Sequence, residues 1–243
     1  MIRARGRALL IAGAVAVAAA ALAMFVPRAG EAPLPARASA QHPTLLLLTS
    51  LPLMFGESFS VQRSGSPALD ALERRYKVVP ISVTAPAELA KGRLLLMAQP
   101  RAQPAEDLVA LDKWVRSGGR LLLLADPLLE WPSKLPLADP LRPPPMFMDT
   151  GLLAHWGIRL DAPDERGVAT RELRGATIVT ASPGQLFGSC KIGAGRIVAD
   201  CRIGKGRVTI VADADLLDVA RLGPEADQNL EAMVGELASL EQR

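Results

Sequence analysis

Three aspartates have the residue type and spacing that could do chemistry: Asp126, Asp213 and Asp215. Each follows an apolar run that is typical of a buried strand. Because neighbouring parallel strands end at the same edge of a sheet, the three carboxylates could converge there. A convergent cluster could bind a divalent metal or form an acid–base pair. In the alternative interpretation, the carboxylates cap the following turns by accepting hydrogen bonds from backbone N–H groups. A helix is expected to start directly after Asp215, which favours the capping interpretation.

The sequence offers no nucleophile in the setting that an α/β hydrolase needs. It contains neither G-x-S-x-G nor G-x-C-x-G, and the two strand ends that could form such an elbow read Gln99-Pro100 and Asp126-Pro127. Of the two histidines, His42 lies in a proline-rich segment, and His155, beside Trp156, is interpreted as a packing or capping residue. We therefore expect no catalytic residue and no enzymatic activity.

Two glycine-rich turns do not match a phosphate-binding loop. Gly204-Lys205-Gly206 lacks the spacing and the hydroxyl residue of a P-loop, and Gly193-Ala194-Gly195 precedes an expected strand instead of a helix. Glycine in such short turns is typical of hairpins, where it supplies a positive φ. We expect no cofactor.

The N-terminus predicts a membrane anchor. Three arginines at 3, 5 and 7 precede an apolar run over residues 8–26, which as a helix would rise about 28 Å, close to the thickness of a bilayer core. The flanking arginines favour a cytoplasmic N-terminus. We expect a cytoplasmic basic segment at 1–7, a transmembrane signal anchor at 8–26, and a linker rich in proline and alanine at 27–43. This predicts a single-pass inner-membrane protein with its C-terminal domain in the periplasm.

A cleaved signal peptide is the alternative interpretation of this segment. Ala38-Ser39-Ala40 has the pattern of small residues that signal peptidase recognises, although it lies far beyond the apolar run. Cleavage there would release a soluble periplasmic ligand-binding domain that begins at Gln41.

Cys190 and Cys201 are the only cysteines. Two expected strands, Leu186–Ile192 and Arg196–Ile203, flank a glycine turn and would place the cysteines opposite one another or within one residue of it. For a domain outside the cytoplasm an oxidised pair is the expected state. Two buried thiols or half of a metal site are the alternatives, and zinc is disfavoured because neither histidine lies near the pair.

Alternating strands and helices from residue 44 onward predict an α/β fold. Short, wholly apolar runs at 44–49, 93–98, 120–125 and 206–212 are typical of strands buried on both faces of a sheet. Helices are expected over 67–76, 86–91, 104–117, 151–156 and 224–240, with a more polar β section over 158–203. This alternation favours a doubly wound sheet.

One connection breaks this alternation. Trp131–Pro145 contains six prolines and issues from the end of an expected central strand, where open α/β sheets place their ligand crevices. Together with Asp126 and the apolar Phe147, this segment predicts a binding rim.

The charge pattern gives no support for nucleic-acid binding. The sequence pI of about 9.1 depends on five arginines within residues 1–37, and the rest of the chain is close to neutral.

A family resemblance accompanies these patterns. Arg116–Pro127 (RSGGRLLLLADP) and Ile203–Asp215 (IGKGRVTIVADAD), followed by Asp227-Gln-Asn229, resemble motifs of the auxiliary extracytoplasmic domains of gliding-type ABC transport systems and of related proteins of unknown function. The resemblance covers most of residues 43–240. It implies a class I glutamine amidotransferase-like domain, a three-layer α/β/α flavodoxin-like fold. Enzymes of that superfamily have a Cys nucleophile and a His–Glu pair, which this chain lacks.

These observations combine into one prediction. Residues 44–243 should form a three-layer α/β/α flavodoxin-like (class I glutamine amidotransferase-like) domain with a mostly parallel sheet, a β-hairpin insertion and an N-terminal transmembrane helix. Its expected function is a non-catalytic, membrane-anchored binding or scaffolding module whose partner is an ABC permease or another envelope protein. The candidate binding residues are Asp126, Trp131, Phe147, Asp213 and Asp215, with no resident metal. A divergent metal-dependent hydrolase that uses the three aspartates is the alternative.

Overall fold

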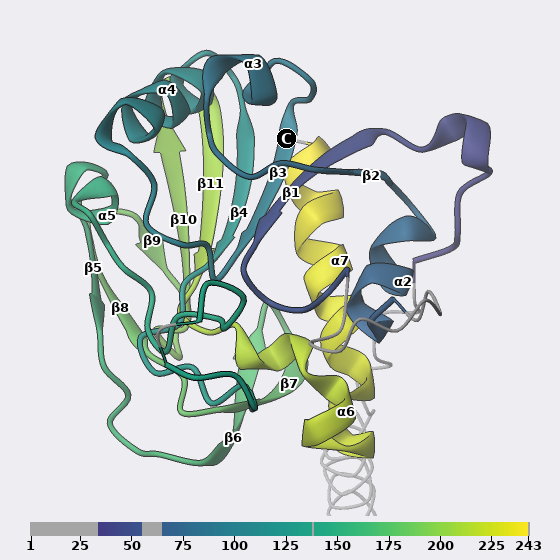
Figure 1. Ribbon diagram of the computed structural model, residues 1–243, viewed down its shortest axis with the longest axis vertical. Coiled ribbons are helices and arrows are strands. Elements are labelled where there is room, and N and C mark those ends of the chain that lie inside the picture. The colour runs from purple at the N-terminus through teal and green to yellow at the C-terminus, as the bar shows by residue number, and fades with distance from the viewer. Residues whose placement is uncertain (1–33, 55–64, 138, 243) are drawn as a thin grey trace, which may run out of the picture. The chain divides into compact units, whose positions relative to one another are not determined.

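The apolar runs form the centre of an open seven-stranded sheet (Figure 1), in the order β2-β1-β3-β4-β11-β10-β9. Its strands are β1 (Thr44–Thr49), β2 (Lys77–Pro80), β3 (Leu94–Ala98), β4 (Arg120–Leu124), β9 (Lys191–Ile192), β10 (Val198–Ile203) and β11 (Gly206–Val211). The sequences of β3 and β4 are almost wholly leucine and are buried, because both faces of the sheet are covered. The computed structural model describes residues 34–54, 65–137 and 139–242, all within the unit Pro33–Arg243.

Helices cover both faces of this sheet (Figure 1). On one face α2 (Pro67–Glu73) and α7 (Asp227–Gln242) pack over a cluster that includes Leu45, Leu72 and Leu237. On the other face α3 (Pro86–Leu89) and α4 (Ala105–Arg116) pack over a second cluster. Local sequence explains why α2 begins where it does, since the Ser66 hydroxyl accepts a hydrogen bond from Leu69 N at 3.1 Å.

Two further two-stranded sheets extend the fold beyond the main sheet. β5 (Ile158–Asp161) pairs with β8 (Gln185–Gly188), and β6 (Val168–Leu173) pairs with β7 (Ala176–Ala181), both antiparallel. The remaining short elements are η1 (Ser39–Gln41), α5 (Leu152–His155), η2 (Asp215–Leu217), α6 (Val219–Leu222) and η3 (Pro224–Ala226).

The predicted fold class is wrong in its sheet and in its membrane segment. The chain is α/β overall, but among the described residues four of the eight strand pairs are antiparallel, so the sheet system is mixed instead of mostly parallel. The hairpin expected over Leu186–Ile203 is not an insertion: β9 and β10 form the edge of the main sheet, and Leu186 belongs to β8, which pairs with β5. The main sheet is mixed for a second, local reason, since only Gly204 and Lys205 connect β10 to β11, and so short a connection forces these strands to be antiparallel.

No helix in the described ranges is long and apolar enough to cross a bilayer. Residues 8–26, on which the transmembrane prediction depends, lie outside the described residues. The predicted localisation, a single-pass inner-membrane protein with its C-terminal domain in the periplasm, therefore has no support from the structure and is corrected.

The disulfide prediction is confirmed. Cys190 and Cys201 are bonded, with their Cα atoms 4.9 Å apart. The pairing of β9 with β10 explains why, because Lys191 lies opposite Asp200 and the two cysteines are the next residues outward on each strand. Within the main sheet, the disulfide therefore staples the edge strand β9 to β10.

Part of the expected linker packs on the domain. Arg37 donates from its backbone N to Arg74 O at 3.2 Å, and its guanidinium pairs with Glu241 at 3.0 Å. His42 is half-buried, and its Nε2 lies 3.0 Å from Arg37 O. Residues 34–43 thus rest against α2 and the end of α7.

Candidate functional site

The structure brings the three predicted aspartates together at the carboxyl ends of β4 and β11. These strands are parallel neighbours, with Leu124 opposite Val211, so the residues that follow them meet at the same edge. Asp126, Asp213 and Asp215 are all fully buried.

Asp126 joins the two strand ends. Its Oδ2 accepts hydrogen bonds from the backbone N of Ala214 at 3.0 Å and of Asp215 at 3.4 Å, and its Oδ1 accepts one from Leu128 N at 2.8 Å. A single carboxylate therefore satisfies donors in the loop after β4 and in the loop after β11.

Asp213 and Asp215 have equally complete sets of partners. Asp213 accepts from Leu216 N at 2.8 Å, and its other oxygen accepts from the hydroxyl of Thr180 on β7. Asp215 accepts from Glu130 N at 2.7 Å, and its second oxygen accepts from the guanidinium of Arg221 at 2.8 Å.

All six carboxylate oxygens thus accept a hydrogen bond from the protein, which is the pattern of residues that cap and join loops. A metal ion at this position would have to displace those donors. Within the described part of the chain, no group of three or more His, Cys, Asp or Glu side chains is arranged to hold a metal.

Burial shifts the protonation of this cluster. Burial, with the charge of Asp215 as the second cause, raises the pKa of Asp126 from 3.8 to about 7. Burial also raises the pKa of Asp215 to about 6, although Glu130 N and Arg221 favour its charged form. The pKa of Asp213 lies well above its ordinary value because of burial and the proximity of Asp126. Raised pKa values are found at catalytic sites, but these three side chains are fully buried and bonded to the protein.

Gln99 is a further residue of this site whose role the sequence does not reveal. It follows β3, is fully buried, and has φ +44°, a left-handed conformation that a residue with a side chain rarely adopts. A turn of this kind after a central strand is where α/β enzymes place a nucleophile. Here the side chain is an amide that hydrogen-bonds to backbone, so the strained turn serves the loops around it.

The two predicted aromatic residues of the rim face inward. Trp131 is half-buried and packs against the cluster under α2 and α7, whereas Phe147 packs against the cluster under α3 and α4. They fix the proline-rich loop to the two cores. The backbone adds a bond between Phe147 N and Asp126 O at 2.6 Å and one between Leu129 N and Pro145 O at 2.9 Å.

Other apolar side chains of the same loop face outward. Four residues are at least half-exposed: Leu137, Leu141, Met146 and Met148. We call these four the loop patch. The sequence marks the loop through its prolines, but it does not separate the inward side chains from the outward ones.

His155 takes no part in this site. It lies on α5, is exposed, and its Nε2 is 3.5 Å from Asp112 and 3.3 Å from Arg116 of α4. The interpretation as a packing or capping residue fits these contacts with α4 better than a role as a general base.

Comparisons with known proteins inform the fold alone. No protein-family model matches the chain, and no curated protein matches it. Among solved structures, the N-terminal domain of mmIFT52 is 15% identical with a TM-score of 0.51, over 81% of this chain and 98% of that one. A cytoplasmic protein from Salmonella typhimurium is 10% identical with a TM-score of 0.51, over 81% and 98%.

Glycosidases also match over part of their length. Gan42B, a GH42 β-galactosidase from G. stearothermophilus, is 14% identical with a TM-score of 0.51, over 83% of this chain and 30% of that one. The chain spans only about a third of the glycosidases that it matches. None of the matches named here is described as an auxiliary domain of an ABC transport system, so that resemblance stays a prediction.

Proposed function

We propose that this domain is a non-catalytic binding module that contacts a partner protein through the loop patch. The observation that carries the proposal is that one loop has a backbone fixed by hydrogen bonds and also exposes several apolar side chains. Leu137 is 79% exposed and Leu141 61%, on a segment whose backbone is fixed by many hydrogen bonds. Exposed apolar side chains gathered in one segment are typical of protein-contact surfaces.

The anchors of this loop come from the segment after β3 and from the loop itself. The Gln99 amide donates to Pro144 O at 3.2 Å, the Arg101 guanidinium donates to the carbonyls of Pro140 and Arg142, and Arg142 donates to Leu135 O. A preordered loop loses little conformational entropy when a partner binds, which favours affinity. Methionine contributes a flexible, polarisable contact surface of the kind found where a protein must adapt to its partner.

The carboxylate cluster supports the non-catalytic part of the proposal. Its oxygens are occupied by backbone and side-chain donors, and the strained turn at Gln99 carries an amide instead of a nucleophile. We infer that this cluster holds the loop in place beneath the patch.

The test is a quantitative capture experiment with the full-length protein. The double variant Leu137→Ser/Met148→Ser should keep the wild-type melting temperature and lose the captured partner. Val109→Ser is the matched control, because Val109 is an apolar residue 53% exposed on α4, outside the loop. An ABC-type permease, which the family resemblance implies, should be looked for among the captured proteins.

The proposal fails if wild type and the double variant capture the same proteins in the same amounts. It fails as well if the Val109→Ser control loses the same proteins, since the effect would then follow from general surface hydrophobicity.

A further inference from the structure

A second feature lies at the opposite end of the sheet from the loop patch, where β4 and β11 begin. A cavity of about 420 Å³ opens beside β10 and β11, a volume within the range of small-molecule sites. Four cationic side chains and a single carboxylate line it: Arg174, Lys191, Arg202, Arg207 and Asp200. We call it the arginine pocket.

Strand register gives the pocket an unfavourable row of like charges. Arg202 of β10 lies directly opposite Arg207 of β11, and Arg207 lies opposite Arg120 of β4. Directly paired residues share one face of a sheet, and like charges placed opposite each other destabilise it. Within the described residues, the guanidinium groups of Arg202 and Arg207 form no hydrogen bond or ion pair, and the bond from Arg207 N to Gly119 O, at 3.2 Å, is a backbone bond that does not offset the repulsion.

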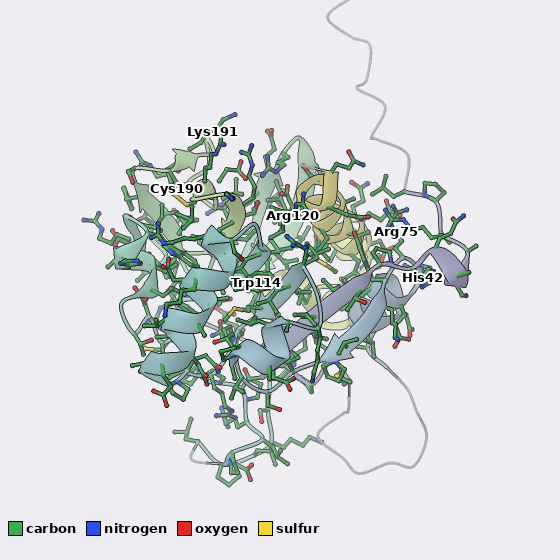
Figure 2. All side chains as sticks on the ribbon, turned by 90° about the horizontal axis from the view of Figure 1, so that it is seen from above. His42, Arg75, Trp114, Arg120, Cys190 and Lys191 are labelled. Carbon is green, nitrogen blue, oxygen red and sulfur yellow. A yellow bond between two sulfur atoms is a disulfide. The ribbon has the colours of Figure 1, made fainter. Side chains whose placement is uncertain are left out.

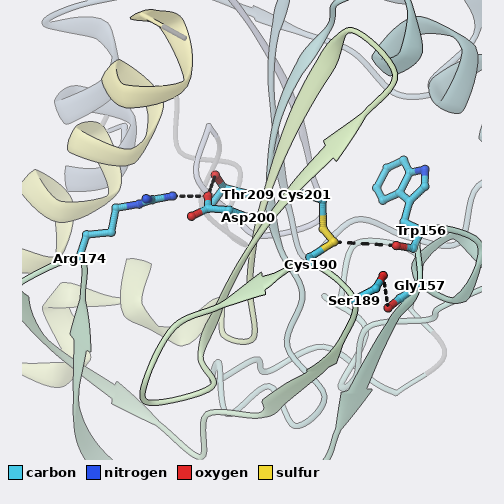
Figure 3. Close-up of a disulfide and its surroundings, with 8 residues drawn as sticks. All are labelled: Trp156, Gly157, Arg174, Ser189, Cys190, Asp200, Cys201 and Thr209. Atoms are coloured by element: carbon cyan, nitrogen blue, oxygen red, sulfur yellow. Dashed lines mark hydrogen bonds and ion pairs between the residues drawn. A yellow bond between two sulfur atoms is a disulfide. The ribbon is translucent and has the colours of Figure 1, made fainter.

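The side chains at the floor of the pocket are held by ion pairs and hydrogen bonds. The guanidinium of Arg174, from the turn between β6 and β7, pairs with Asp200 and with Glu236 of α7. The Thr209 hydroxyl donates to Asp200 at 3.0 Å. Figure 3 shows Arg174 paired with Asp200, which is also bonded to Thr209, on one side of the strands, while the disulfide lies on the other.

The disulfide fixes one cation of the rim. Cys190 immediately precedes Lys191, and its bond to Cys201 holds the start of β9 against β10. Figure 2 looks onto this end of the molecule and shows Lys191 beside Cys190. The lysine therefore stands on a constrained strand next to the arginine row.

From this geometry we infer that the arginine pocket binds a small anion with at least two negative charges, carried on phosphate or carboxylate groups. Guanidinium groups match the oxygen atoms of phosphate and carboxylate in bidentate geometry. A bound anion would neutralise the row formed by Arg202 and Arg207. Binding would thus relieve the repulsion that lowers the stability of the free protein, and this relief would add to the affinity for the anion. The pocket and the loop patch share no residue, and this inference is therefore independent of the proposed partner contact.

Thermal denaturation of the full-length protein tests the inference, with pyrophosphate and citrate as probes and sodium chloride at matched ionic strength as the reference. Pyrophosphate or citrate at millimolar concentration should raise the melting temperature of wild type above the chloride reference. A response to pyrophosphate alone assigns the site to phosphate groups, and a response to citrate alone assigns it to carboxylates.

Two variants separate a binding site from a structural or general charge effect. Arg202→Gln should melt at or above the wild-type temperature without the anion and should bind it at least tenfold more weakly by calorimetry. Arg166→Gln removes an exposed arginine that does not line the pocket and should leave binding unchanged.

The inference is overturned if neither anion raises the melting temperature, or if Arg166→Gln weakens binding as much as Arg202→Gln. A lower melting temperature of free Arg202→Gln would also overturn it, because the arginine row would then serve the fold. The Leu137→Ser/Met148→Ser variant should bind the anions normally, so failure of the partner proposal and failure of this one are distinguishable.

Discussion

The side-chain amide of Gln99 forms a closed pair of hydrogen bonds with the backbone of Asp126. Its Oε1 accepts from Asp126 N at 3.0 Å, and its Nε2 donates to Asp126 O at 3.2 Å. The pair extends the ladder between β3 and β4 past the ends of both strands, with a side chain in place of the backbone. It also explains the left-handed φ of Gln99, because the turn directs the amide toward the neighbouring strand.

Replacing Gln99 with Ala should destabilise the domain by about 1–3 kcal/mol, since the buried N–H of Asp126 loses its acceptor and Pro144 O loses a donor, whereas Asp126 O keeps the bond from Phe147 N. Chemical denaturation should show a lower midpoint with an unchanged slope. Gln242→Ala, at an exposed position near the end of α7, is the control and should change stability by less than about 0.5 kcal/mol. Equal effects of the two substitutions would contradict the structural role of the amide pair.

The carboxylate cluster predicts a pH dependence of stability. Folding raises the pKa values of Asp126 and Asp215 to about 7 and about 6, so between about pH 4 and about pH 7 the folded state binds more protons than the unfolded state. The free energy of unfolding contributed by these groups therefore falls as the pH rises through this range, and it is greatest on the acidic side.

Asp213 contributes to the same fall, because burial and the nearby Asp126 raise its pKa as well. Asp213→Asn should therefore flatten the fall, because the amide keeps the shape of the neutral acid and cannot ionise. Melting temperatures measured across the same pH range at constant ionic strength provide the check. Asp70→Asn, on an exposed position of α2, should leave the wild-type slope unchanged. A wild-type curve that rises steadily from pH 4 to pH 7, with Asp213→Asn parallel to it, would show that the cluster ionises freely.

The disulfide should stabilise the domain through the short loop that it closes. Cys190 and Cys201 are 11 residues apart, for which the chain-entropy estimate gives about 2–3 kcal/mol. The double Cys→Ala variant should therefore melt at a lower temperature, and peptides from non-reduced wild type should show the link by mass spectrometry. Two free thiols in protein from its native compartment would contradict this prediction.

Two glycines offer a matched pair of substitutions with opposite expected signs. A Cβ at Gly206, the first residue of β11, would lie 2.0 Å from Val115 O and 2.5 Å from Gly119 O, both backbone atoms. Gly206→Ala should therefore cost at least about 2 kcal/mol. A Cβ at Gly235 in α7 meets open space, so Gly235→Ala should gain about 0.5–1 kcal/mol from helix propensity. Denaturation midpoints that move in the same direction would refute the packing described at the start of β11.

Local patterns in the sequence predict those parts of the structure that depend on local physics. Leucine runs such as Leu121–Leu124 predict strands buried on both faces, and the turn at Gly193 predicts the disulfide. The polar strands β6 and β7 pair across a local two-residue turn, Arg174-Gly175, but the placement of their sheet against α7 depends on tertiary contacts such as that between Val179 and Asn229. The β-propensity of a segment predicts little where tertiary contacts determine its position.

The sequence also does not predict which side chains share a face of the sheet or point toward solvent. The arginine row requires the register of β4 against β11, two strands that are distant in sequence, because Arg120 lies 87 residues before Arg207 in the chain. Apolar residues occur along the whole loop after β4, yet Trp131 packs inward and Leu137 faces solvent. Proline fixes backbone dihedrals without determining which side chains meet the core.

This division within the loop gives a last prediction, on stability. Trp131→Ser and Phe147→Ser each remove an anchor that packs against one of the two cores, and each should lower the free energy of unfolding by about 1.5–3 kcal/mol. Leu137→Ser alters an outward side chain and should stay within about 0.5 kcal/mol of wild type. Chemical denaturation of the three variants measures the difference directly. If Trp131→Ser proves as stable as Leu137→Ser, the tryptophan is no anchor, and it would then belong with the exposed residues as a direct contact for the partner.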